Sequence, residues 1–279
     1  PCPSCRRCSA AGRAFTSATP AAWALEKELQ VGPDELRGGF ELLNQHWSPG
    51  GAVVINPSAT GRASLDARWY DVGLHIDGYL ALDGNPGNNR AVITDLETTE
   101  VTARLDYLFE IENILQVLPF IEGTVYPYVK GSTKYNWVGA EAWYLTPLEG
   151  LEVGASLQYN LADNTIASTP SVSVSEHYWL HTLGVRYFYQ EAPLDLSGWG
   201  LLNLANRAYH RQVTGANTQG ATTFNLGGQL TLPLPWDSTW TFLKLDSYWY
   251  VDSDDRKALF AAGRDKTELV FALGFEYRN

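Results

Sequence analysis

The sequence lacks several features that identify common protein classes. Its 279 residues include no methionine, only three cysteines, and charged residues amount to just 18%. No stretch approaches the roughly 18–20 consecutive apolar residues of a transmembrane helix. The formal net charge of −11 argues against nucleic-acid binding, which requires a basic patch or stripe. The missing methionine predicts a processed or truncated product, and the absence of a signal-peptide hydrophobic region fits a mature exported protein.

Alternating apolar and polar residues are what the chain has in abundance. In the clearest repeat, between Asn136 and Asp163, two alternating stretches flank a turn at Pro147–Gly150. Side chains of a β-strand point to opposite faces with period two, so each stretch has one apolar and one polar face. Strands of globular proteins are usually about 5–6 residues long, whereas tilted strands of about 9–11 residues span a bilayer. The length of these stretches favours a transmembrane β-barrel.

About ten such strands are expected from Tyr70 onward. Their ranges are Tyr70–Leu82, Thr98–Ile111, Pro119–Gly131, the two halves of the 136–163 repeat, Tyr178–Gln190, Leu194–Tyr209, Thr222–Leu232, Ser238–Val251 and Thr267–Arg278. Along the chain, the connections between these strands mostly alternate between short turns and long polar loops. Bacterial outer-membrane barrels have short periplasmic turns and long extracellular loops. This pattern predicts that both termini lie in the periplasm, which requires an even number of strands.

The last strand carries a family resemblance. The stretch TELVFALGFEYRN at 267–279, with aromatic residues at Phe275 and Tyr277, resembles the C-terminal strand of Gram-negative outer-membrane β-barrel proteins. That family usually ends on an aromatic residue, whereas here Arg278 and Asn279 follow. The resemblance covers roughly residues 70–279. It implies an all-β, antiparallel, up-and-down transmembrane barrel of about ten strands (range 8–12) in the bacterial outer membrane, in contact with lipid and lipopolysaccharide.

A soluble barrel or sandwich is the alternative fold, because it also consists of alternating strands and short turns. Such folds place the apolar face inward and the polar face in water. The polar faces of these strands contain Gly, Gln, Asn and charges of both signs, not the dense Lys, Glu and Thr of a soluble sheet. Composition and strand length together favour the membrane barrel.

Residues 1–66 are expected to form a separate periplasmic segment, and residues 67–279 the barrel. Helices are predicted at 21–30 and 34–47, and the segment is expected to plug the barrel or to bind a partner protein. Cys2, Cys5 and Cys8 provide too few ligands for a structural zinc site, which needs four. One disulfide and one free thiol are expected in an oxidising compartment. No metal or cofactor is predicted.

The charged residues on the polar faces are the candidate functional residues, since they would line the lumen of a barrel. They are Asp71, His75, Asp77, Arg104, Asp106, Glu110, Glu122, Lys130, Glu141, Glu152, Arg186, Lys244, Asp246, Glu268 and Glu276. An acidic excess predicts a small passive channel for ions or small polar solutes with a mild cation preference, because charged rings set pore selectivity. The alternative is that these residues pair across the lumen and close it. The protein would then be a structural barrel that anchors an envelope or surface assembly.

An enzyme is not expected. Ser173, Ser175, Glu176, His177 and His181 lie close together in sequence, but a catalytic triad is defined by geometry and not by composition. The oxygen-rich loops near Asp83 and Asp252 are better explained as turns than as calcium sites. A homo-oligomer is compatible with this architecture.

Overall fold

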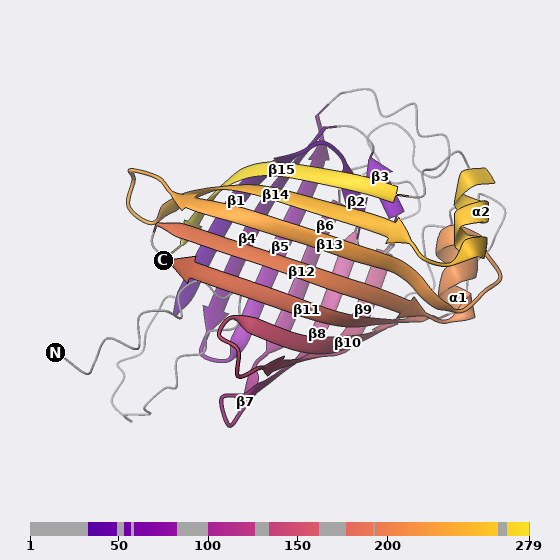
Figure 1. The fold of residues 1–279 in the computed structure, drawn as a ribbon, viewed down its shortest axis with the longest axis horizontal. Helices are drawn as coiled ribbons and strands as arrows, with labels where there is room; N and C mark the ends of the chain where they lie inside the picture. Colours follow the sequence, from indigo (N-terminus) through magenta and orange to yellow (C-terminus); the bar gives the residue numbers. More distant parts are fainter. Residues whose placement is uncertain are drawn as a thin grey trace.

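The protein folds as an antiparallel β-barrel closed by 12 strands, with one short extra strand (Figure 1). The computed structural model describes residues 33–48, 53–56, 59–82, 100–125, 134–161, 177–191, 193–261 and 267–278. The barrel strands are β1 (Glu35–Leu43), β4 (Thr60–Trp69), β5 (Val72–Ala81), β6 (Glu100–Tyr107), β8 (Leu115–Val125), β9 (Lys134–Leu145), β10 (Leu151–Asn160), β11 (Trp179–Glu191), β12 (Leu194–Ala205), β13 (Gly220–Pro233), β14 (Thr239–Tyr250) and β15 (Thr267–Arg278).

Two pairings close the sheet into a barrel. β6 pairs with β8, and the short β7 (Phe109–Ile111) continues alongside β8 beyond the end of β6. β1 pairs with β15, with Arg37 opposite Arg278. Asn44 extends this seam: its amide nitrogen donates to the Leu269 carbonyl at 3.0 Å, and its amide oxygen accepts from the Phe271 backbone at 2.7 Å. The side chain therefore continues the ladder of backbone hydrogen bonds beyond the last residue of β1. A separate hairpin contains β2 (His46–Ser48) and β3 (Val53–Asn56).

The expected helix at 34–47 is wrong, because residues 35–43 form the barrel strand β1. β4 also belongs to the barrel, so the expected boundary at 66/67 falls inside a barrel strand. The estimate of about ten strands was therefore low by these two. The outward positions of β1 and β4 include Gly38, Gly61 and Ala63, which weaken the apolar face that would mark a strand. The helix predicted at 21–30 lies outside the described residues.

Strand ends divide the connections into two sets. The end of the barrel where β1 begins and β15 ends also carries the turns β4–β5, β9–β10, β11–β12 and β13–β14, each five residues or fewer. The opposite end carries the longer connections, two of which contain helices: α1 (Arg207–Tyr209) with the π-helical turn η3 (His210–Thr214), and α2 (Ser253–Ala261). Figure 1 shows these helices together at one end of the barrel. The alternation predicted from the sequence is confirmed in these connections.

The two helical connections are locked together by a buried polar cluster. His210 and Asp255, both fully buried, are joined by a 2.8 Å contact between Nδ1 and Oδ1. Asp252 begins α2 by accepting the backbone N–H groups of Asp254 at 2.7 Å and Asp255 at 3.1 Å. Partial burial opposes the ionisation of Asp252, but these hydrogen bonds outweigh it and hold its pKa below the ordinary value.

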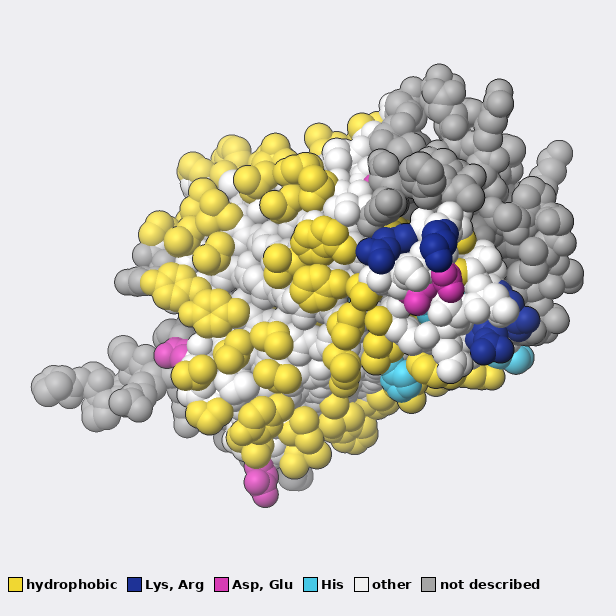
Figure 2. Space-filling view, turned by 45° about the vertical axis from the view of Figure 1, so that its right-hand side comes forward, with side chains coloured by type: hydrophobic (Ala, Val, Ile, Leu, Met, Phe, Trp, Pro, Cys, Tyr) yellow, Lys and Arg dark blue, Asp and Glu magenta, His cyan; other side chains and the backbone are white. Residues whose placement is uncertain are grey.

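Apolar side chains cover the outside of the barrel. Leu226 and Leu273, at the centres of β13 and β15, are 51% and 52% exposed, as are apolar residues at the outward positions of the other strands. Figure 2 shows these side chains as a broad hydrophobic belt, with the visible charged side chains toward the two ends. This is the reverse of a soluble barrel, which would bury its apolar face. Among the described residues, no helix is long and apolar enough to span a membrane.

Leu226→Arg and Leu273→Arg are each expected to block insertion, because an arginine facing lipid at the bilayer midplane costs about 2–4 kcal/mol. Gln229→Arg is the control, since Gln229 also lies on β13 but lines the interior. The measurement is the amount of heat-modifiable, folded barrel in isolated membranes. Normal assembly of both leucine variants would contradict the assigned lipid-facing surface.

Candidate functional site: the barrel lumen

Most of the charged residues predicted to line a lumen do face the interior. They are His75, Asp77, Arg104, Asp106, Glu122, Glu141, Glu152, Arg186, Lys244, Asp246 and Glu276. They alternate along their strands with exposed apolar residues. The structure thus places these side chains on the face of each strand opposite the exposed apolar residues.

The remaining described candidates lie near the ends of the barrel, where Glu110 and Glu268 still occupy inward-facing positions of their strands. Asp71 lies in the β4–β5 turn, where its carboxylate accepts from the Tyr107 hydroxyl at 3.2 Å. Glu110 is on β7 and accepts from Gln116 at 3.0 Å. Glu268 lies near the end of β15 and accepts from Gln45 at 3.3 Å. Lys130 lies outside the described residues.

The sequence analysis missed the lumen residues of β1 and β4: Arg37, Glu41, Arg62, Asp66 and Arg68. The expected helix and the expected segment boundary concealed them. The spacing of Arg62, Ser64, Asp66 and Arg68 at every second position is a strand signal that could have revealed them. Alternate small residues facing outward made that signal weak.

Ion pairs connect the lumen charges of β1, β4, β5 and β6. Arg62 bonds to Asp77 at 2.7 Å and also pairs with Glu41. Arg68 pairs with Asp106 at 2.9 Å, and their side chains are only 4% and 1% exposed. Gly73 lies between these two residues in register, and a Cβ there would lie within 2.7 Å of both side chains. The glycine therefore leaves the space through which the ion pair passes.

His75 lies between two carboxylates. Its Nδ1 is 2.8 Å from Asp66 and its Nε2 is 2.6 Å from Asp106. A carboxylate oxygen accepts hydrogen bonds, and a neutral imidazole has only one N–H to donate. Both hydrogen bonds therefore form only when the ring carries both protons, and His75 then joins β4 to β6 as a cation.

The remaining ion pairs also join residues on the same or nearby strands of the wall. Arg186 pairs with Glu152 on the neighbouring strand at 2.9 Å. Arg104 on β6 pairs at 2.6 Å with Glu141 on β9, which is two strands away in the sheet. Arg278 on β15 pairs at 2.9 Å with Asp195 on β12, which is three strands away. Opposite walls of a 12-strand barrel are six strands apart. The ion pairs among the described residues thus run along the wall and do not cross the lumen.

Aromatic side chains in the lumen lie against glycines of the next strand. Each aromatic residue is directly opposite its glycine in the strand register, and a Cβ on that glycine would lie 2.3–2.6 Å from the ring. The pairs are Phe120 with Gly139, Trp143 with Gly154, Trp199 with Gly227, and Phe242 with Gly274. The missing side chains let the rings lie flat on the wall.

Basic side chains cover several of these rings. The guanidinium carbon of Arg186 is 3.4 Å from the ring centre of Trp143, and that of Arg104 is 3.9 Å from Phe120. The Lys244 ammonium is 5.5 Å from the Trp199 ring. Cations at such positions are attracted to the ring face. The stacking fixes the long basic side chains close to the wall.

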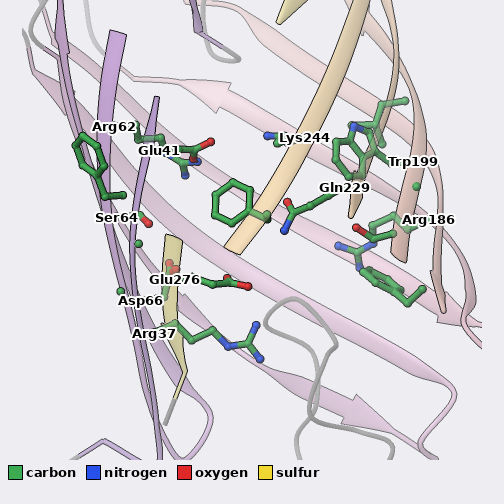
Figure 3. Close-up of a pocket in the computed structure, with 18 of the residues that line it drawn as sticks. Arg37, Glu41, Arg62, Ser64, Asp66, Arg186, Trp199, Gln229, Lys244 and Glu276 are labelled. Atoms are coloured by element: carbon green, nitrogen blue, oxygen red, sulfur yellow. The ribbon is translucent and has the colours of Figure 1, made fainter. Parts of the chain in front are cut away.

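Connected hollows occupy the interior. A cavity of about 460 Å³ lies between β1 and β4 on one side and β11 and β12 on the other, with Arg37, Glu276 and Trp199 in its lining (Figure 3). Cavities of about 390 and 320 Å³ adjoin it, and all three share Trp143. The paired charges therefore leave open space inside the barrel.

Of the five residues considered for enzymatic chemistry, the structure describes the two histidines. His177 stacks on Tyr159 with 5.7 Å between the ring centres, and His181 lies against Trp179 with 4.6 Å between the ring centres. Ser173, Ser175 and Glu176 are outside the described residues, as are the three cysteines. Within the described ranges, no group of three His, Cys, Asp or Glu residues could hold a metal ion.

Asp106→Ala is expected to lower the free energy of unfolding by about 3–5 kcal/mol, because it leaves the buried Arg68 without its carboxylate partner. Asp254→Ala is the matched control. It removes an exposed partner of Lys257 and should cost below about 1 kcal/mol. Denaturant titration of the folded protein in detergent measures both. Equal stability of the two variants would contradict the assignment of a buried ion pair.

Comparison with known proteins supports the fold. No family model and no curated protein sequence matches this chain. Among solved structures, the NanC porin has a TM-score of 0.53 and 11% identity over 87% of this chain and 98% of that one. The KdgM porin (TM-score 0.48, 8% identity, 87% and 98% covered) and an outer membrane channel from Pseudomonas putida F1 (0.48, 12%, 94% and 100%) also match. This chain has the closed β-barrel fold of outer-membrane porins.

Proposed function

We propose that this protein is a passive channel for ions and small polar solutes in a bacterial outer membrane, with a mild preference for cations. One observation carries the proposal: the ion pairs of the lumen follow the wall, so they leave its centre hollow. Pairing across the lumen would instead have supported a closed structural barrel. An interior with polar walls and connected hollows suits water-soluble solutes.

The outer surface supports the membrane location. Strands of 8 to 14 residues carry the apolar belt, which is the length expected for a bilayer-spanning barrel. The fold shared with the NanC porin supports an outer membrane. We place the end with the short turns in the periplasm, as in bacterial barrels generally. Both ends of the barrel chain would then be periplasmic.

The cation preference rests on the balance of charge in the lumen. Carboxylates outnumber basic side chains in the ion pairs of the wall: Glu41, Asp66, Asp77, Asp106, Glu141, Glu152, Asp195, Asp246 and Glu276 pair with Arg62, Arg68, His75, Arg104, Arg186, Lys244 and Arg278. Outside these pairs, Glu122 adds a carboxylate that lines the 390 Å³ cavity, and Arg37 adds a cation that lines the 460 Å³ cavity, so the carboxylates remain in excess. An excess of fixed negative charge favours cations in a narrow pore.

Single-channel recording of the purified protein in a planar bilayer, under a salt gradient, tests the proposal. Discrete conductance steps with a reversal potential on the cation-selective side are expected. A protein that inserts without conducting would contradict the channel and support the closed structural barrel. Conduction with an anion-selective reversal potential would contradict the cation preference alone.

Glu122→Gln should lower the cation-to-anion permeability ratio by roughly fourfold. A unit charge about 10 Å from an ion in water stabilises a cation by about 0.4 kcal/mol and destabilises an anion by about the same amount, and the two effects multiply in the ratio. Glu149→Gln is the control, because it removes the same charge from an exposed turn outside the lumen. An equal change in reversal potential for both variants would argue against a role for Glu122 in the pore.

A further inference from the structure

Trp199 lies on the lumen wall in a row of three residues. It is directly opposite Gly227 on β13, and Gly227 is directly opposite Asp246 on β14. The indole crosses over Gly227, and its Nε1 donates to Oδ1 of Asp246 at 2.9 Å. Trp199 and Lys244 both line the 460 Å³ cavity (Figure 3).

The absence of a side chain at position 227 makes this crossing possible. A Cβ on Gly227 would lie 2.4 Å from the Trp199 ring and 2.4 Å from Oδ1 of Asp246. Real Cβ contacts are not this short, so these groups would have to move. The three nearest atoms all belong to side chains, so the strand backbone can stay in place. Because the wall is behind the indole, the ring can move only toward the lumen or along it.

The same arrangement recurs around the barrel. Trp143 crosses over Gly154, and its far edge reaches Gly184 one strand further on, where a Cβ would lie 3.1 Å away. Phe120 and Phe242 lie on their own glycines in the same way. All four rings lean toward the strand that follows along the chain. Repetition at four places indicates a common arrangement that keeps large side chains out of the lumen.

We propose that these aromatic–glycine pairs set the bore of the channel, and that Trp199 on Gly227 is a size-determining pair. This inference rests on the proposed channel function and adds the residues that determine its size limit. A tryptophan at an inward position would ordinarily project into the lumen. Here Gly227 leaves room for the Trp199 ring to pack against the barrel wall. Solutes are then selected by the space that these rings, with the basic side chains stacked on them, leave free.

The experiment compares Gly227→Ala with Gly198→Ala in single-channel recordings. The backbone of Gly198 on the neighbouring β12 borders the same cavity, but an added Cβ would point outward, on the face of Leu196, and would meet nothing closer than 3.7 Å. Gly227→Ala should lower the conductance by roughly half, since a barrel of this size is only a few side chains wide inside. It should also lower the size of the largest polyethylene glycol that enters the pore. Gly198→Ala should leave both unchanged.

Trp199→Ala provides the second variant, because it only removes atoms and does not crowd the sheet. It should raise both the conductance and the polymer size limit. In a Trp199→Ala background, adding Gly227→Ala should have a much smaller effect on both, since no ring remains and only the Asp246 carboxylate is displaced. A merely structural role for Gly227 would instead give the same loss in both backgrounds.

The outcomes separate the two claims. If the unaltered protein conducts but Gly227→Ala and Trp199→Ala leave the conductance and size limit unchanged, the bore-setting role is overturned and the channel stands. If Gly227→Ala does not assemble, an unchanged conductance for Trp199→Ala alone overturns the role. If the unaltered protein inserts without conducting, the channel and its bore are both rejected.

Discussion

The structure depends on the closure of the sheet, because a bilayer offers no water to satisfy the backbone groups of an edge strand. The β1–β15 and β6–β8 pairings close the barrel, and the side chain of Asn44 continues the first of these ladders where the backbone of β1 ends. Closure also fixes two surfaces with opposite chemistry. Every second side chain must suit lipid, and the others must suit an enclosed lumen.

Charges in that lumen are enclosed by the barrel wall, and the way they pair determines whether the barrel is filled. Lateral pairs such as Arg186 with Glu152 compensate the cost of desolvation while staying close to the wall. Stacking of Arg186 on Trp143 and packing of Trp143 over Gly154 act in the same direction. The ion pair, the aromatic ring and the glycine thus pack as successive layers on the wall. The interior therefore contains charged groups and still has open space.

Alternation, strand length and the C-terminal resemblance together predicted the fold class, and alternation indicated the inner faces of the strands from β5 onward, because period-two patterning is a local property of the sequence. It failed for β1 and β4, where Gly38, Gly61 and Ala63 replace the apolar residues of the outer face. The role of the lumen glycines could not be predicted from the sequence for a different reason. Gly227 has meaning only beside Trp199 and Asp246, which are brought together by register between strands and not by nearness in sequence. Pairing along the wall likewise depends on register.

The most direct test of an open, water-filled lumen is the chemical accessibility of Ser156, which lines the 320 Å³ cavity. A chain with Cys2, Cys5 and Cys8 replaced by serine would carry Ser156→Cys, with Leu157→Cys on the lipid-facing side as its control. A small charged thiol reagent added to the barrel in lipid vesicles should modify position 156 and leave position 157 unmodified. Protection of position 156 in the folded barrel would contradict an open lumen.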